Sequence, residues 1–189
     1  MDRTSPGRTA RIWTAGHSDR PLEALLELLA GPEIELLADV RRYPGSRRHP
    51  QFGEERLAPA LAAAGIAYRH LPGLGGRRRA RPDSPNTAWR NEGFRAYADH
   101  MASEEFRAAL AELEAAARER RTAVLCAEAV PWRCHRRLIA DALVARGWEV
   151  AHLLASGRDE VHTLHPDALV QDDRLTYPAA APQQIGLFR

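Results

Sequence analysis

Two carboxylates, Asp39 and Glu128, each stand at or just after the end of an apolar run and close to arginines. Burial raises the pKa of a carboxyl group and a neighbouring guanidinium lowers it, so one carboxylate could act as an acid and the other as a base. A structural ion pair between each carboxylate and an arginine is the simpler interpretation. We expect catalysis because a histidine, His17, and several anion-binding residues fall in the same predicted cleft.

The segment Cys134–His135–Arg136 lies where a helix is expected to begin. The N-terminus of a helix favours anions and lowers the pKa of a thiol. The segment is therefore either an anion-binding turn with Arg136 as its clamp, or the site of a catalytic thiolate at Cys134. Its spacing differs from the phosphatase loop, in which a cysteine and an arginine are separated by five residues.

Metal binding is a further alternative, because Cys126, Cys134, His135 and His17 are all metal-ligand types. Seven residues separate the two cysteines, whereas structural zinc sites use spacings of about two to four. No cofactor is therefore predicted, and a metal ion at Cys126, Cys134 and His135 stays an alternative. The structural interpretation places Cys126 in the core and His17 in a hydrogen-bonded turn, with Ser18 capping the next helix.

All 27 basic residues are arginines, and eight of them occur in two short windows without acidic residues. Guanidinium groups bind phosphate or carboxylate with paired hydrogen bonds, so these windows predict an anionic partner unless they are simply solvated loops. The candidate anion- or substrate-binding residues are Ser18, Arg41, Arg42, Tyr43, Arg47, Arg77, Arg78, His135 and Arg136. Aromatic side chains on which bases could stack lie in or beside the same segments; they are Tyr43, Phe52, Tyr68, Trp89 and Trp132.

The apolar periodicity predicts strands that alternate with helices. The expected strands are 11–15, 34–40, 66–70, 122–126 and 148–153, and the expected helices are 21–30, 54–64, 93–101, 104–120 and 133–146. This alternation predicts a doubly wound α/β fold, with a mainly parallel five-stranded sheet and helices on both faces. Ligands bind beyond the carboxyl ends of strands in such folds, and the candidate residues follow the first four strands.

The length of 189 residues fits one domain. We expect an N-terminal extension at 1–10, a single α/β domain at 11–155 and a C-terminal extension or tail at 156–189. The chain has no apolar run of about 20 residues and no secretory signal pattern, which predicts a cytoplasmic protein without a membrane partner. The oligomeric state is not predicted.

Five segments together resemble a known family: TAGHSDR (14–20), LLADVRRYPGSRRHPQF (36–52), YRHLPGLGG (68–76), FRAYADHM (94–101) and VLCAEAVPWRCHRRLIADAL (124–143). In this order they resemble the family catalogued as domain of unknown function 488, over roughly residues 11–155. The resemblance implies a compact α/β domain with these segments as its signatures, and it implies no particular activity.

The residues themselves favour a hydrolase that acts on a phosphate-bearing substrate, either nucleic acid or a nucleotide. Arginines would hold the phosphate while Glu128 or Asp39 activates water. The bond could be N-glycosidic or phosphate-linked. Neither a Walker loop nor a Rossmann glycine pattern occurs, so ATP and NAD are not favoured. The alternatives are a noncatalytic nucleic-acid-binding module, and a thiol or metal protein centred on Cys126, Cys134 and His135.

Overall fold

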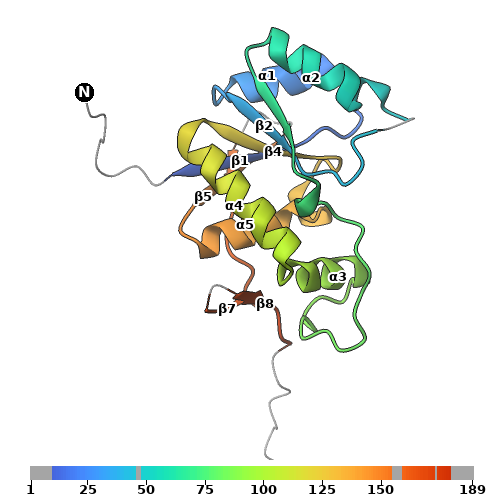
Figure 1. Cartoon of the computed structure of the whole chain (residues 1–189), viewed down its shortest axis with the longest axis vertical. Helices are drawn as coiled ribbons and strands as arrows, with labels where there is room; N and C mark the ends of the chain where they lie inside the picture. The colour runs from blue at the N-terminus through green and yellow to red at the C-terminus, as the bar shows by residue number, and fades with distance from the viewer. Residues whose placement is uncertain (1–9, 46–47, 155–158, 173, 180–189) are drawn as a thin grey trace, which may run out of the picture.

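The computed structural model describes residues 10–45, 48–154, 159–172 and 174–179, and its centre is a six-stranded sheet with the order β3-β2-β4-β1-β5-β6 (Figure 1). Strands β1 to β5 pair in parallel, and β6 pairs antiparallel with β5. The strands are β1 (Arg11–Gly16), β2 (Leu36–Asp39), β3 (Ala67–His70), β4 (Thr122–Cys126), β5 (Glu149–Leu153) and β6 (Asp159–Val161). The predicted α/β fold is confirmed, with six strands in this sheet where five were expected.

Helices cover both faces of the sheet, as the alternating pattern predicts (Figure 1). Helices α1 and α2 pack on one face, and α3, α4 and α5 pack on the other. Their bounds are α1 (Leu22–Ala30), α2 (Glu54–Ala63), α3 (Glu92–Met101), α4 (Glu104–Glu119) and α5 (Arg136–Ala145). Short 3-10 turns occupy Pro50–Phe52, Pro72–Leu74 and Pro131–Arg133. In the part of the chain that the structure describes, no helix is both long enough and apolar enough to cross a membrane.

The side chains of each strand point alternately to the two faces of the sheet, and this divides the core into two clusters. In β1, Ile12 belongs to the cluster under α3, α4 and α5, while the next residue, Trp13, belongs to the cluster under α1 and α2. In β4, Val124 and Leu125 divide in the same way. Because successive side chains of a strand point to opposite faces, apolar residues at every position produce a sheet buried on both sides. The central strands are therefore rigid supports for the loops that follow them.

Strand β6 and helix α5 differ from the sequence prediction for local reasons. Strand β6 was not predicted, because its three residues are all exposed and two of them are acidic, so they show no apolar alternation. Helix α5 begins at Arg136, three residues later than expected, because Pro131–Arg133 forms a separate 3-10 turn. Cys134, which follows that turn, has an extended backbone. As a result, Cys134 lies in the connection between β4 and α5 rather than in the helix.

The C-terminal region is fastened to α5 by a buried polar network around Asp141. The Asp141 carboxylate accepts hydrogen bonds from His162 Nε2 at 2.9 Å and from the Tyr177 hydroxyl at 2.8 Å. His162 Nδ1 lies 3.0 Å from His152 Nε2, and His152 Nδ1 lies 2.7 Å from the Thr14 hydroxyl in β1. The strands of this region are β7 (Leu169–Gln171) and β8 (Arg174–Thr176), which form a separate antiparallel pair. This network braces the helix whose first turn carries candidate site residues.

Candidate functional site

A cleft lies at the carboxyl ends of β1, β2 and β4. After β1 and β2 the chain continues into helices on one face of the sheet, and after β4 it continues into α5 on the opposite face. In open α/β sheets, ligands bind where the connections diverge in this way. Two adjoining pockets, of about 290 and 530 Å³, make up the cleft. They share the residues Arg41, Tyr43, Arg77, Ala127 and Glu128.

Each half of the cleft has its own chemistry. The thiol half is lined, beyond the shared residues, by Arg42, Gly76, Cys126, Arg133, Cys134 and His135. The histidine half is lined, beyond the shared residues, by His17, Ser18, Asp19, Gly45, Arg48 and His49. Most of the residues singled out from the sequence therefore lie together here. Three of the described candidate catalytic and anion-binding residues do not line the cleft, namely Asp39, Arg78 and Arg136. Arg47 lies outside the described residues.

Asp39 is a structural anchor and not the catalytic group expected from the sequence. Its carboxylate is fully buried and accepts a two-pronged interaction from Arg41, from Nε at 2.9 Å and from Nη2 at 2.5 Å. The Tyr68 hydroxyl donates to the same carboxylate at 2.8 Å. A carboxylate held in this way has no contact with a ligand in the cleft. Its effect on the cleft is to fix the guanidinium group of Arg41, which does line it.

His17 orients Arg41 and is itself neutral. Its Nδ1 lies 2.8 Å from the Ser18 carbonyl oxygen, which can only accept, so Nδ1 carries the proton. The Nε2 atom then accepts from Arg41 Nη1 at 3.3 Å. Burial lowers the pKa of His17 to about 4, and the ring stacks on Phe52 with centroids 4.3 Å apart. The lone pair of Nε2 is already engaged, so His17 positions Arg41 and does not act as the base.

Ser18 does not cap α1 as the sequence suggested. Its hydroxyl donates to Asp19 at 3.2 Å, and the N-cap position of α1 is Pro21. Ser18 instead ties two loops together, because its backbone N–H donates to the Ala127 carbonyl at 2.8 Å. The side chain remains at the edge of the histidine half.

The buried, neutral state of His17 predicts a loss of stability in acid. The pKa is 6.5 for an unperturbed histidine and about 4 in the folded protein, so between these values the unfolded state binds more protons. The free energy of unfolding should therefore be fully present above about pH 6.5 and fall as the pH drops toward about 4. Urea unfolding near pH 7 and near pH 5 checks this, with His17→Asn as the comparison. The decrease should be smaller in the variant, and an equal decrease would contradict a neutral, buried His17.

The loop 127–133 is held in one shape by Arg136 and Gly16. Arg136 is fully buried, and its guanidinium donates to the carbonyl oxygens of Glu128 and, at 2.7 Å, of Ala129. The expectation that Arg136 clamps an anion is therefore wrong, because its hydrogen bonds go to the backbone of the loop. A side chain at Gly16 would overlap the Glu128 carbonyl. These contacts fix the backbone of Glu128 against the ends of β1 and α5.

Among the described residues, two exposed carboxylates line the cleft: Asp19 lines only the histidine half, whereas Glu128 lines both halves. The backbone of Glu128 is fixed by Arg136, while its side chain is exposed. Arg41 and Arg77 line the same shared region. The sequence prediction named Asp39 and Glu128 together, and the geometry separates them into a buried anchor and an accessible carboxylate.

The two thiols form a cluster with His135 in the thiol half. The sulfur atoms of Cys126 and Cys134 lie 3.7 and 3.9 Å from His135 Nδ1. Both thiols are free and buried. A hydrogen bond from Cys134 lowers the pKa of the Cys126 thiol, and the charge of Arg136 acts in the same direction. Burial raises the pKa of the Cys134 thiol well above its usual value. The raised pKa of Cys134 does not favour the catalytic thiolate that the sequence suggested at this position.

The arginines of the loop after β3 divide between two places. Arg77 is exposed and lines the cleft, and its carbonyl accepts from Arg42 Nη1 at 3.4 Å. Arg78 turns away to Glu105, with hydrogen bonds of 2.9 and 3.1 Å to the two carboxylate oxygens. Arg78 is thus a structural residue and not the anion-binding residue predicted. Gly76 lets this loop pass over the ring of His135, because a Cβ there would stand 2.9 Å from His135 Nδ1.

Two aromatic side chains near the cleft are open to solvent. Tyr43 is 64% exposed and lines both halves, with the Arg42 guanidinium 5.9 Å from its ring centroid. Trp132, in the loop after β4, is 50% exposed. Trp89 is buried at 7% exposure and packs against Phe94 and Tyr177, so it is part of the core and not a stacking surface.

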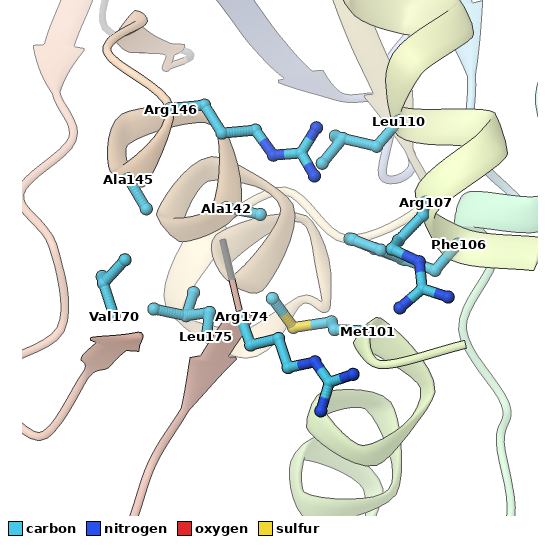
Figure 2. Close-up of a pocket in the computed structure, with 10 residues that line it drawn as sticks. All are labelled: Met101, Phe106, Arg107, Leu110, Ala142, Ala145, Arg146, Val170, Arg174 and Leu175. Atoms are coloured by element: carbon cyan, nitrogen blue, oxygen red, sulfur yellow. The ribbon is translucent and has the colours of Figure 1, made fainter. Parts of the chain in front are cut away.

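Arg133 and Gly76 line the thiol half although the sequence analysis did not name them as site residues. The signal for Arg133 is its position directly before Cys134. The signal for Gly76 is its position at the end of the YRHLPGLGG segment, which follows the expected strand 66–70. A separate hollow lies between α4, α5 and the β7–β8 pair, away from the strand ends (Figure 2). Its lining is apolar apart from Arg107, Arg146 and Arg174, without a carboxylate, thiol or imidazole. We place no chemistry there.

Comparison with known proteins gives one match. A sequence model described as "Domain of unknown function DUF488" matches residues 21–143. No curated protein and no solved structure matches the chain. The matched range contains Asp39, Glu128 and the Cys126–Cys134–His135 cluster, while His17 precedes it. Because this match covers more than half of the sequence, the chain belongs to the DUF488 family.

Proposed function

We propose that the chain is a hydrolase that acts on a phosphate-bearing substrate, nucleic acid or a nucleotide, with Glu128 activating the attacking water. The observation that carries the proposal is the position of Glu128, whose exposed carboxylate lies where the two halves of the cleft meet. A general base must be accessible to water and held beside the reacting group. The Arg136 guanidinium holds the backbone of Glu128 in place by donating a hydrogen bond to its carbonyl oxygen.

The cationic lining supports an anionic substrate. Arg41, Arg42, Arg77 and Arg133 all line the thiol half. Arg41 is already oriented by its contacts with Asp39 and His17, so its remaining N–H groups need little rearrangement to donate to a phosphate. The ring of Tyr43 at the rim offers a face on which a base could stack.

The proposed step leaves the choice of bond open. Glu128 takes a proton from water while the water oxygen bonds to phosphorus, or to the sugar carbon of an N-glycosidic bond. The electron pair of the broken bond leaves with the displaced oxygen or base. The arginines stabilise the negative charge on the phosphate as the reaction proceeds. His17 contributes by holding Arg41 in place.

The proposal is tested first by ligand binding. Inorganic phosphate, nucleotides, nucleosides and short oligonucleotides are compared by thermal shift and by hydrolysis assays on the full chain. We expect phosphate-bearing compounds to stabilise the protein because they bind only the native state. Arg77→Ala and Arg133→Ala should each weaken binding by about tenfold or more, since each removes one charged hydrogen-bond donor from the cleft.

Arg81→Ala is the matched control for these two variants. Arg81 belongs to the same arginine-rich loop, but it pairs with Asp83 and does not line the cleft. Its removal should leave the affinity unchanged. An equal loss of nucleic-acid binding in Arg81→Ala, together with no turnover of any substrate, would favour a noncatalytic nucleic-acid-binding module over the hydrolase. Binding that does not weaken with added salt would contradict both.

A further inference from the structure

The Cys126–Cys134–His135 cluster has the spacing of a tetrahedral metal site. The three candidate ligand atoms, the two sulfurs and Nδ1, all lie within 4.8 Å of one another. The two sulfur-to-Nδ1 distances are 3.7 and 3.9 Å. Zinc–sulfur and zinc–nitrogen bonds of about 2.3 and 2.0 Å place tetrahedral ligands roughly 3.5 to 3.8 Å apart. The atoms therefore stand close to where a bound ion needs them.

The three candidate ligands are also held in place by the elements that carry them and by the residues that pack on them. Cys126 ends the buried strand β4, and His135 is the N-cap residue of α5. Tyr97 packs against the His135 ring with centroids 4.9 Å apart, and Gly76 covers the same ring. Nδ1 is the ring atom turned toward both sulfurs, and Nε2 is buried without a hydrogen-bond partner among the described residues. The imidazole is thus held by packing, with Nδ1 aimed into the cluster.

The ligand atoms of the cluster favour a particular kind of cation. These atoms are two sulfurs and one imidazole nitrogen, whereas Mg²⁺ prefers oxygen ligands. Cysteine binds a metal ion as a thiolate, and two thiolates neutralise a divalent ion. An ion whose affinity comes from thiolate and imidazole ligands is therefore the one that suits the site, and Zn²⁺ has that preference.

We propose that Cys126, Cys134 and His135 bind one Zn²⁺ ion through their two sulfurs and Nδ1, with the fourth position open to the cleft. All three residues line the thiol half, so an open position faces the same space as Arg42 and Arg133. Zinc sites with three protein ligands and one open position are typical of catalysis. A water molecule bound there ionises near neutral pH and supplies a nucleophile. Its relevance to hydrolysis rests on the proposed function, whereas the binding itself does not.

The test uses the full chain purified without a histidine tag and under a phosphine reductant. After addition of Zn²⁺ and removal of the excess, elemental analysis should give about one zinc per chain. Replacement by Co²⁺ should produce strong sulfur-to-cobalt absorption bands. Cys134→Ser and His135→Ala should each weaken the affinity for zinc by about 100-fold or more, because even groups that only support a ligand account for 10- to 100-fold.

A histidine from the other half of the cleft provides the matched control. His49→Ala should bind zinc with the affinity of the unchanged protein, since His49 lies in the histidine half. If Cys134→Ser does not fold, His135→Ala decides, because that side chain is only half-buried. Zinc content well below one per chain with no sulfur-to-cobalt bands, or binding unaffected by both variants, overturns the inference. If the protein binds zinc but no phosphate compound, the zinc site is supported and the proposed function is contradicted. If it binds phosphate compounds but no zinc, the zinc site is contradicted and the proposed function is supported.

Discussion

Replacing Glu128 by glutamine is expected to lower kcat/KM for hydrolysis of the phosphate-bearing substrate by about 10²- to 10⁴-fold. Glutamine has nearly the same shape as glutamate but does not take a proton from water. The fold should be retained, because the side chain is exposed and it is the backbone carbonyl of Glu128 that Arg136 holds. Steady-state kinetics of the purified variant measures the effect, and a thermal melt confirms that the variant is folded.

Glu119→Gln is the matched control for this substitution. Glu119 is an exposed glutamate at the end of α4, and it does not line either half of the cleft. Its replacement makes the same chemical change and should leave the kinetics unaltered. Activity of Glu128→Gln that stays within about tenfold of the unchanged protein would remove Glu128 as the acid–base group. Parallel losses in both variants would point to a general effect of charge.

The position of the cleft could be predicted from the sequence because it depends on the order of the strands. The apolar runs that end near Gly16, Asp39 and Cys126 are short, bounded and buried, so their ends were found to within a few residues. Parallel strands bring such ends to one edge. The residues that follow these strands therefore line one cleft, as expected, although they come from segments more than a hundred residues apart.

The roles of individual charged residues could not be predicted in the same way, because a role depends on partners that are distant in sequence. Arg78 pairs with Glu105 on α4, 27 residues away, and so faces away from the cleft. Arg136 lies in the first turn of α5, where an arginine is usually solvated, and its burial depends on the loop carbonyls that it meets. The short strand β6 was missed because exposed, acidic residues carry no strand pattern.

The largest effect on stability is expected at Asp39. Replacement by alanine should lower the free energy of unfolding by about 3–5 kcal/mol, because it leaves the charge of Arg41 buried without its partner. Arg41 is only 6% exposed, and Asp39 is fully buried, so solvent compensates little of this loss. The hydroxyl of Tyr68 loses its acceptor at the same time. Urea unfolding at neutral pH measures the change, and Asp39→Asn separates the effect of charge from that of volume.

Asp83→Asn is the control that distinguishes this pair from an ordinary surface ion pair. Asp83 also pairs with an arginine two residues away, Arg81, but both side chains are exposed, so no measurable loss of stability is expected. Because the Asp39 carboxylate fixes Arg41, the Asp39 variants should also bind phosphate more weakly even though Asp39 does not line the cleft. A stable Asp39→Ala variant with unchanged phosphate affinity would contradict the role of Asp39 as the anchor of Arg41. Stability and binding should therefore fall together, whereas in Glu128→Gln activity should fall alone.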